Sequence, residues 1–266
     1  MKAVLKYPGA KNRIADWIGS YIPVHDVYME PFAGSLAVLF NKPRCHIETV
    51  NDLDGEIVNF FRALRDCPEK LVKKIKLTPF ARGEYKAAFE KTDDSIEKAR
   101  RYCVRCWQGF GNSQLYQNGF KSGQQSHSPN PAKAWAELPE ILYAAAERLK
   151  GVQIECLPAL ELISRYDTPD VFIYADPPYL QGMRKNNLYK HEMKDSEHEE
   201  LLKVLEKHPG KILISGYDND LYNSYLSGWR KEYKRTNAEC GIARTEILWM
   251  NYEHPGKQLT FEDIGG

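Results

Sequence analysis

The sequence has no long hydrophobic run and little cysteine. No stretch approaches the roughly 20 apolar residues that a membrane-spanning helix needs, and residues 1–8 contain no apolar segment typical of a secretory signal. We therefore expect a cytoplasmic protein that is not bound to a membrane. The six cysteines are irregularly spaced, and a chain of 266 residues, 42% of them hydrophobic, can build its core without disulfides. Reduced thiols are the expected state.

The sequence also lacks residues at the spacing typical of metal ligands. Cys103 and Cys106 form a single Cys-x-x-Cys pair, and no second ligand pair with metal spacing follows it. A zinc site needs about four ligands, so the pair is better explained as two thiols on one face of a helix. The sequence therefore predicts no metal site.

Acidic residues are missing from one part of the chain. From Lys98 to Lys133 the sequence has six basic residues and no acidic one across 36 positions. Residues 67–150 carry a net charge of +6 and the remaining residues −5, so the overall net charge of +1 hides a basic segment. Such a segment is typical of a protein with a polyanionic partner, although a solvated basic surface would also explain the charge alone.

Apolar runs and amphipathic segments alternate along most of the chain. This alternation predicts an α/β fold with a parallel sheet and crossover helices. Strands are expected at 27–30, 46–50, 152–155, 171–175, 211–215 and 247–250, and helices at 36–40, 55–64 and 196–207. Helical patterns dominate from residue 67 to about 106, and another helix is expected at 134–149. We predict one α/β domain, residues 1–66 and 151–266, interrupted by a mostly helical insertion at 67–150.

The strongest local signal follows the expected strand 171–175 directly, and consists of Asp176, Pro177, Pro178 and Tyr179. Open α/β sheets bind ligands at the carboxyl ends of their strands, and two prolines keep the backbone rigid there. A carboxylate, a carbonyl and an aromatic ring then converge on a small volume. They suit the exocyclic amine of an adenine, because the two oxygens accept its N–H bonds and direct its lone pair at a methyl group while the ring stacks on the base. A proline-rich turn with a capping aspartate is the competing interpretation.

Two further segments are typical of nucleoside binding. A glycine turn between a strand and a helix lets the backbone approach a ligand closely, and here it consists of Glu30, Pro31, Phe32, Ala33, Gly34 and Ser35. Asp52 follows 18 positions after Gly34, where an acidic residue binds ribose hydroxyls, with Asp54 as a competitor. Tyr7 and Lys11 flank a Pro-Gly turn near the N-terminus, which is either a cofactor contact or an ordinary surface turn.

These three motifs, in this order, resemble the Dam-type family of DNA adenine-N6 methyltransferases, and the resemblance extends from Leu5 to Tyr252. It implies a Rossmann-like, S-adenosylmethionine-dependent methyltransferase domain that flips its target base, with an inserted target-recognition domain that reads double-stranded DNA. Residues 189–193, 214–218 and 246–248 match weaker downstream segments of the family.

The resemblance also implies roles for individual residues. The implied catalytic residues are Asp176, Pro177, Pro178 and Tyr179. The implied cofactor contacts are Tyr7, Lys11, Pro31, Phe32, Ala33, Gly34, Ser35, Asp52 and Asp176.

The chain departs from the family pattern at two positions. Leu36 stands about where the cofactor loop usually carries a second glycine, and Cys156 lies near the place where a polar or acidic residue often faces the adenine of the cofactor. The insertion does not carry the motifs of the GATC-methylating members clearly enough to transfer their target. The recognition sequence, the oligomeric state and a restriction endonuclease partner do not follow from the sequence.

The insertion and the segment after residue 180 supply the expected DNA contacts. Arg and Lys suit phosphates and guanine edges, whereas Asn and Gln suit adenine edges, and four glycines between 109 and 123 predict a loop or hairpin that enters a groove. The expected contacts are Arg101, Arg105, Gln108, Asn112, Gln114, Tyr116, Asn118, Lys121, Arg184 and Lys185. Solvated polar loops are the alternative for both segments.

Other classes of protein fit less well. A cytosine-C5 methyltransferase needs a nucleophilic cysteine after a proline, and none of the six cysteines follows one. Cytosine-N4 enzymes more often begin the catalytic motif with serine. Methyltransferases that act on RNA or protein share a Pro-Pro-aromatic motif but lack this N-terminal segment and this placement of the insertion. The departures at Leu36 and Cys156 leave open a further alternative, a relative that binds DNA but does not transfer methyl groups.

Overall fold

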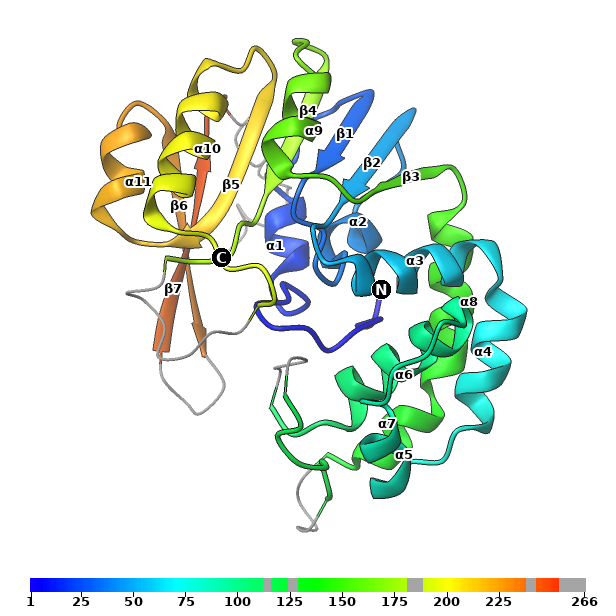
Figure 1. Cartoon of the computed structure of the whole chain (residues 1–266). Coiled ribbons are helices and arrows are strands. Elements are labelled where there is room, and N and C mark those ends of the chain that lie inside the picture. Colours follow the sequence, from blue (N-terminus) through cyan, green and yellow to red (C-terminus); the bar gives the residue numbers. More distant parts are fainter. Residues whose placement is uncertain (112–115, 124–128, 181–188, 238–242, 254–266) are drawn as a thin grey trace, which may run out of the picture.

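The computed structural model describes residues 1–111, 116–123, 129–180, 189–237 and 243–253. Its centre is a seven-stranded sheet with the order β3-β2-β1-β4-β5-β7-β6 (Figure 1). The strands β3, β2, β1, β4 and β5 are parallel, and β7 runs antiparallel to both β5 and β6. The strands are β1 (Val27–Glu30), β2 (Ile47–Asn51), β3 (Val152–Glu155), β4 (Val171–Ala175), β5 (Lys211–Tyr217), β6 (Arg230–Asn237) and β7 (Ala243–Met250).

Helices cover both faces of this sheet. Because side chains alternate along a strand, Met29 and Ile173 pack with α9 (Ala159–Arg165), α10 (Asp195–Lys207) and α11 (Asp220–Tyr225) on one face. Tyr28 and Phe172 belong to the core on the other face, with α1 (Ala15–Gly19), α2 (Ala37–Asn41) and α3 (Gly55–Asp66). This mixed α/β architecture confirms the expected Rossmann-like methyltransferase fold.

The strand order places the ends of two strands side by side. From β1 the chain continues to β2 and β3 on one side, whereas β4 leads to β5 on the other. β1 and β4 are themselves neighbours, with Met29 opposite Ile173. A ligand crevice forms where an open sheet changes direction in this way, and the segments that follow β1 and β4 both lie there.

The helical insertion lies beside α3 at one side of the molecule (Figure 1). Its helix α6 packs on α3, and α4 packs on α8. Buried side chains of the insertion, such as Tyr102 and Trp107, belong to the same core as those of α2 and α3. The helices are α4 (Pro68–Leu77), α5 (Arg82–Ala87), α6 (Ser95–Gln108), α7 (Pro131–Ala136) and α8 (Leu138–Leu149).

Several elements differ from the sequence prediction. Strand β6 was not predicted, because this edge strand has the polar sequence Arg-Lys-Glu-Tyr-Lys-Arg-Thr-Asn and no apolar alternation. The helix expected at 134–149 is two helices, α7 and α8, which meet at Glu137. The last strand begins at Ala243 rather than at residue 247.

The thiols of the described cysteines are free, as expected, and those of Cys103 and Cys106 lie buried on α6. Burial raises the pKa of both thiols, so they stay protonated at neutral pH. In the described part of the chain, no helix has the length and apolar character needed to cross a membrane.

Candidate active site

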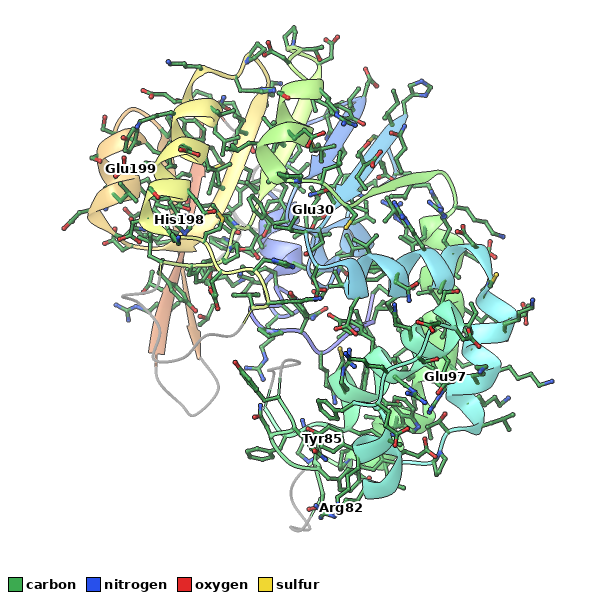
Figure 2. The ribbon with its side chains drawn as sticks, in the orientation of Figure 1. Glu30, Arg82, Tyr85, Glu97, His198 and Glu199 are labelled. Carbon is green, nitrogen blue, oxygen red and sulfur yellow. The ribbon has the colours of Figure 1, made fainter. Side chains whose placement is uncertain are left out.

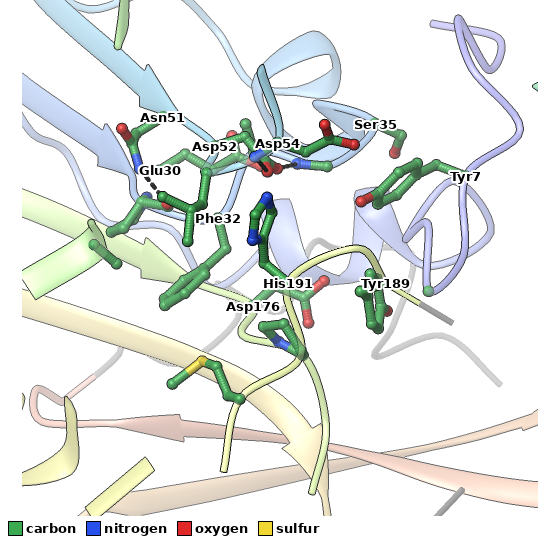
Figure 3. A pocket seen from close by; sticks show the side chains of 18 of the residues that line it. Tyr7, Glu30, Phe32, Ser35, Asn51, Asp52, Asp54, Asp176, Tyr189 and His191 are labelled. Carbon is green, nitrogen blue, oxygen red and sulfur yellow. Dashed lines mark hydrogen bonds between the residues drawn. The ribbon is translucent and has the colours of Figure 1, made fainter. Parts of the chain in front are cut away.

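One pocket lies at the point where the sheet changes direction (Figure 3). Its walls come from the N-terminal turn, the loops after β1, β2 and β3, the start of the Asp-Pro-Pro-Tyr segment and residues 189–193. All of the predicted cofactor contacts line it: Tyr7, Lys11, Pro31, Phe32, Ala33, Gly34, Ser35, Asp52 and Asp176. The structure therefore brings three motifs that are far apart in the sequence into one cavity.

The glycine turn is held against the acidic loop by a backbone hydrogen bond. The N–H of Gly34 donates to Asp52 Oδ2 over 2.9 Å, and the N–H of Asp54 donates to Asp52 Oδ1 over 2.9 Å. Gly34 has a φ of +46°, and a Cβ atom there would lie 3.4 Å from the ring of Tyr7. Glycine thus permits the left-handed backbone of this turn.

Burial raises the pKa of Asp52 to about 6, although hydrogen bonds from backbone N–H groups, those of Asp54 and Gly34 first, oppose the shift. The carboxylate is therefore poised to change its charge slightly below neutral pH. Each of its oxygens has a further lone pair beyond the bond to the backbone, so it can still accept hydrogen bonds from a ligand.

Leu36 has the backbone conformation of the glycine that it replaces. Its φ is +57° and its ψ is +28°, and it precedes α2. The side chain is completely buried in the core. A left-handed backbone costs a residue other than glycine about 1–2 kcal/mol, so the surrounding apolar contacts must hold it there. The departure noted in the sequence is compatible with an intact loop.

Asn51, the last residue of β2, joins three loops of the pocket. Its Nδ2 donates to the carbonyls of Pro31 (2.9 Å) and Leu157 (3.0 Å), and its Oδ1 accepts from the N–H of Leu157 (2.8 Å). Asn51 was not among the predicted site residues. Its one signal in the sequence was a polar residue between the expected strand 46–50 and Asp52.

The loop after β3 supplies an apolar wall. Leu157, Pro158, Ala159 and Leu160 line the pocket, whereas Cys156 is exposed and is not part of the lining. The polar contact that the family often has near this position is therefore replaced by aliphatic surface.

Residues 189–193 cross the mouth of the pocket and were not among the predicted contacts. Lys190 Nζ lies 3.3 Å from Asp54 Oδ1, and the ring of Tyr189 lies 5.9 Å from that of Tyr7. In Figure 3 the side chain of His191 points toward Asp52. A Cβ atom on Gly9 would lie 2.3 Å from the hydroxyl of Tyr189, so this contact requires glycine in the N-terminal turn.

Both oxygens of the Asp176 carboxylate have partners. Ser215 Oγ donates to Oδ1 over 2.8 Å, and Lys11 Nζ lies 3.0 Å from Oδ2. Lys11 also donates to the carbonyl of Gly9 over 2.9 Å, and its Nζ lies 4.8 Å from the centre of the Tyr179 ring. Burial would lower the pKa of Lys11, but the charges of Asp176 and Glu246 outweigh it and raise the pKa, so the lysine is an ammonium ion.

The remaining members of the Asp-Pro-Pro-Tyr segment surround this ion pair. Pro178 lines the pocket, and Pro177 is buried behind it. The hydroxyl of Tyr179 donates to Glu246 Oε2 over 2.9 Å, and its ring meets that of Tyr217 edge-on with centres 4.5 Å apart. Of the four predicted catalytic residues, Asp176 and Pro178 line the cavity, whereas Pro177 and Tyr179 lie beside it in the chain and are not part of its lining.

Glu30 forms the floor of the pocket at the end of β1 (Figures 2 and 3). It is buried and accepts a hydrogen bond from the hydroxyl of Tyr28 over 2.9 Å. Burial raises its pKa to about 8, a shift that the bond from Tyr28 opposes and the negative charge of Asp176 strengthens. Glu30 therefore carries a proton for most of the time at neutral pH.

Three of the predicted DNA contacts have structural roles instead. Gln108 is fully buried, and its side chain binds the carbonyl of Pro79 and the N–H of Ala81. Because both ends of this amide are used inside the fold, the prediction that it reads a base edge was wrong. Arg101 binds Glu97 at 3.0 Å on its own helix.

Arg105 is likewise directed inward. Its guanidinium lies 2.6 Å from Glu56 Oε1, donates to the carbonyl of Ala88, and lies near the rings of Phe89 and Tyr102. With its side chain only 10% exposed, it joins α6 to the first turn of α3. Basic character alone did not distinguish such an internal ion pair from a phosphate contact.

Three of the other predicted contacts, Tyr116, Asn118 and Lys121, follow α6 in a hairpin. The N–H of Phe110 donates to the carbonyl of Gly119 over 2.7 Å, and that of Lys121 to Gln108 over 2.8 Å. The side chains of Tyr116, Asn118 and Phe110 are exposed; Phe110, at 67%, was not predicted. Asn112, Gln114, Arg184 and Lys185 lie outside the described residues.

A second basic group faces this hairpin. Burial, followed by the charge of Lys121, lowers the pKa of Lys6 to about 8. The ammonium of Lys6 lies 4.1 Å from the centre of the Trp107 ring. Two like charges thus meet between the N-terminal segment and the insertion, an arrangement that an anion would stabilise.

The sheet and the pocket define a Rossmann-like methyltransferase. Residues 7–239 match the family model of D12 class N6 adenine-specific DNA methyltransferases, and the chain belongs to that family. It is 23% identical to the Type II methyltransferase M.MjaIII of Methanocaldococcus jannaschii, over 95% of this chain and 99% of the relative. It is also 23% identical to the Retron Ec67 DNA adenine methylase of Escherichia coli, over 92% of this chain and 88% of the relative. The chain is thus a DNA adenine-N6 methyltransferase, as the sequence motifs indicated.

Proposed function

We propose that the pocket binds S-adenosylmethionine and that Asp176 and Tyr179 present an adenine to its methyl group. The observation that carries the proposal is the convergence of Asp52, the glycine turn and Asp176 on one cavity. Asp52 is placed to accept hydrogen bonds from ribose hydroxyls, and the apolar wall after β3 suits the adenine of the donor. The acidic side chains of the lining favour a positively charged sulfonium.

The reaction needs little more than placement and electrostatics. The Asp176 carboxylate and the Pro177 carbonyl accept the two N–H bonds of N6, which leaves its lone pair free to attack the methyl carbon. The N–C bond forms as the bond between that carbon and sulfur breaks, and N6 then loses a proton to solvent. Tyr179 offers its ring to the base, and the protonated Glu30 adds no full negative charge beneath Asp176.

Lys11 lies where the base is proposed to bind. Its ammonium now lies against the carboxylate and over the Tyr179 ring, the two groups that we assign to the base. A base that is flipped out of the duplex can exchange for the ammonium, because its amine offers N–H donors to the same acceptor. The lysine is then free to contact the cofactor or the DNA.

The insertion is proposed to hold double-stranded DNA. Tyr116, Asn118 and Lys121 lie on or beside the hairpin, and the adjoining Lys6 adds positive charge. Asn112, Gln114, Arg184 and Lys185 are proposed to complete this surface. The similarity to a Type II methyltransferase supports a restriction-modification context, in which a restriction endonuclease would share the recognition site.

The test measures donor binding and methyl transfer separately. Calorimetry with S-adenosylmethionine should give at least tenfold weaker binding for Asp52→Ala, since several hydrogen bonds to one carboxylate are lost. Arg44→Ala, which removes an exposed side chain bound to the carbonyls of Glu147 and Lys150, is the control. Duplex DNA and RNA are then offered with labelled methyl donor. Label on RNA alone, or unchanged binding by Asp52→Ala, would refute the proposal.

A further inference from the structure

Two polar side chains behind the catalytic segment have no role in the reaction as described so far. Ser215 lies on β5, the neighbour of β4, and Glu246 lies on β7, the neighbour of β5. The strands are paired so that Ser215 is opposite Leu248 and Tyr217 is opposite Glu246. Both residues belong to segments that resemble the family, and both are buried in the sheet.

Ser215 is the middle member of a directed chain of hydrogen bonds that ends at Asp176. Its Oγ is 2.8 Å from Asp176 Oδ1 and 2.9 Å from the hydroxyl of Tyr174. A carboxylate can only accept, and serine has one hydroxyl proton. Ser215 therefore donates to Asp176, and Tyr174 donates to Ser215. Since Tyr174 and Ser215 are each 1% exposed, water does not compete for these bonds, and the chain fixes the plane of the carboxylate.

Glu246 fixes the aromatic group in a comparable way. Its Oε2 accepts from the hydroxyl of Tyr179 over 2.9 Å, and the ring of Tyr217 supports the Tyr179 ring from the side. Glu246 is only 7% exposed. The hydroxyl end of Tyr179 is thus bound to the sheet while its ring faces the Lys11 ammonium.

We propose that Ser215 and Glu246 are positioning residues for methyl transfer, with Ser215 orienting the Asp176 carboxylate and Glu246 orienting the Tyr179 ring. The inference rests on the proposed roles of Asp176 and Tyr179. Neither side chain touches the base. Ser215 restricts the rotation of Asp176, and Glu246 restricts that of Tyr179, the two groups that contact the base. A displacement of about 1 Å in such a group can reduce a rate by about 100-fold.

The first experiment separates orientation from stability. Ser215→Ala should reduce kcat at least tenfold while the Kd values for S-adenosylmethionine and DNA stay within twofold. Ser215→Thr, which keeps the hydroxyl, should restore most of the rate. Tyr174→Phe breaks the chain one step earlier without a change in ring volume, and should reduce kcat less than Ser215→Ala. The double variant should be no slower than Ser215→Ala alone, because Tyr174 acts through Ser215.

The controls remove the same chemical groups elsewhere. Ser224→Ala deletes a hydroxyl that binds the carbonyl of Leu221 on α11, and should leave kcat unchanged. A normal kcat for Ser215→Ala, or a loss shared equally by Ser224→Ala, would overturn the role of Ser215.

The second experiment follows the aromatic ring. With 2-aminopurine at the target position of duplex DNA, stacking on Tyr179 quenches the fluorescence of the flipped base. Glu246→Ala should change this quenching and lower kcat at least fivefold, but should have no further effect in a Tyr179→Phe background. Glu232→Ala removes a carboxylate of the adjacent strand β6 that accepts from the hydroxyl of Tyr21, and should have no effect. Additive losses of Glu246→Ala and Tyr179→Phe would overturn the role of Glu246.

A third variant distinguishes failure of this inference from failure of the proposed function. If Asp176→Ala abolishes transfer while Ser215→Ala has no effect, only the positioning role is wrong. If Asp176→Ala is active, the proposed site itself is wrong, and the positioning role with it.

Discussion

Leu36 allows a direct measurement of backbone strain beside the active site. Its φ of +57° belongs to the left-handed region, and its side chain is completely buried. Truncation of a buried leucine costs about 2–5 kcal/mol of unfolding free energy. Both Leu36→Ala and Leu36→Gly should therefore be less stable than the natural chain by at least about 2 kcal/mol.

The difference between these two variants reports the strain. In an ordinary backbone, glycine is less stable than alanine by about 0.5–1 kcal/mol. At Leu36, alanine also bears the cost of the left-handed conformation, about 1–2 kcal/mol. The order should therefore reverse, with Leu36→Gly more stable than Leu36→Ala by about 0.5–1 kcal/mol.

Urea unfolding tests this order, because a change in the midpoint at constant slope is a change in stability. Leu39 is the matched control: it is equally buried, and it lies within α2. There the ordinary order should hold, and Leu39→Ala should be more stable than Leu39→Gly. If alanine is the more stable replacement at both positions, the left-handed assignment of Leu36 and the account of the cofactor loop are wrong.

Three further predictions concern the pocket and the insertion. The pKa of Asp52 is raised to about 6, and ribose hydroxyls donate to the charged form of its carboxylate. The affinity for S-adenosylmethionine should therefore increase as the pH rises from 5 to 7. Calorimetry should show that Asp52→Asn loses this pH dependence. The same raised pKa means that the protonated carboxyl stabilises the fold below about pH 4, and that this contribution is lost as the pH rises through about 6. Gly9→Ala should weaken donor binding at least tenfold in the same assay, since its Cβ would lie 2.3 Å from the Tyr189 hydroxyl; unchanged affinity would show that the contact is not needed. Arg105→Ala should lower the free energy of unfolding by about 2–3 kcal/mol by leaving Glu56 without this partner, and a reduced salt dependence of DNA binding would instead favour a phosphate contact.

The parts of the fold that were predictable are those with an apolar signal. Parallel strands buried on both faces have continuous apolar runs, which is why β1, β4 and β5 were found. The edge strand β6 contributes no buried side chain among its described residues, so hydrophobic pattern could not reveal it. Its pairing with β7 comes from the backbone.

The site was predictable where function fixes residue types and spacing. The N–H of Gly34 donates a hydrogen bond to Asp52, and this contact explains their separation of 18 residues in the sequence. Asn51 and Ser215 could not be assigned, because their roles depend on which loops and strands become neighbours in space. The internal contacts of Arg105 and Gln108 could not be predicted for the same reason: a side chain that suits DNA also suits a carboxylate or a carbonyl within the fold.

The central claim is that Asp176 presents adenine N6 for methylation. Its most direct test is a single-turnover reaction of the purified chain with duplex DNA and S-adenosylmethionine labelled on the methyl group, followed by mass spectrometry of the released nucleosides. The natural chain should yield labelled N6-methyladenine, and Asp176→Ala should yield less than a thousandth of that rate with the Kd for DNA within threefold of normal. Labelled N6-methyladenine formed at a similar rate by Asp176→Ala would contradict the account.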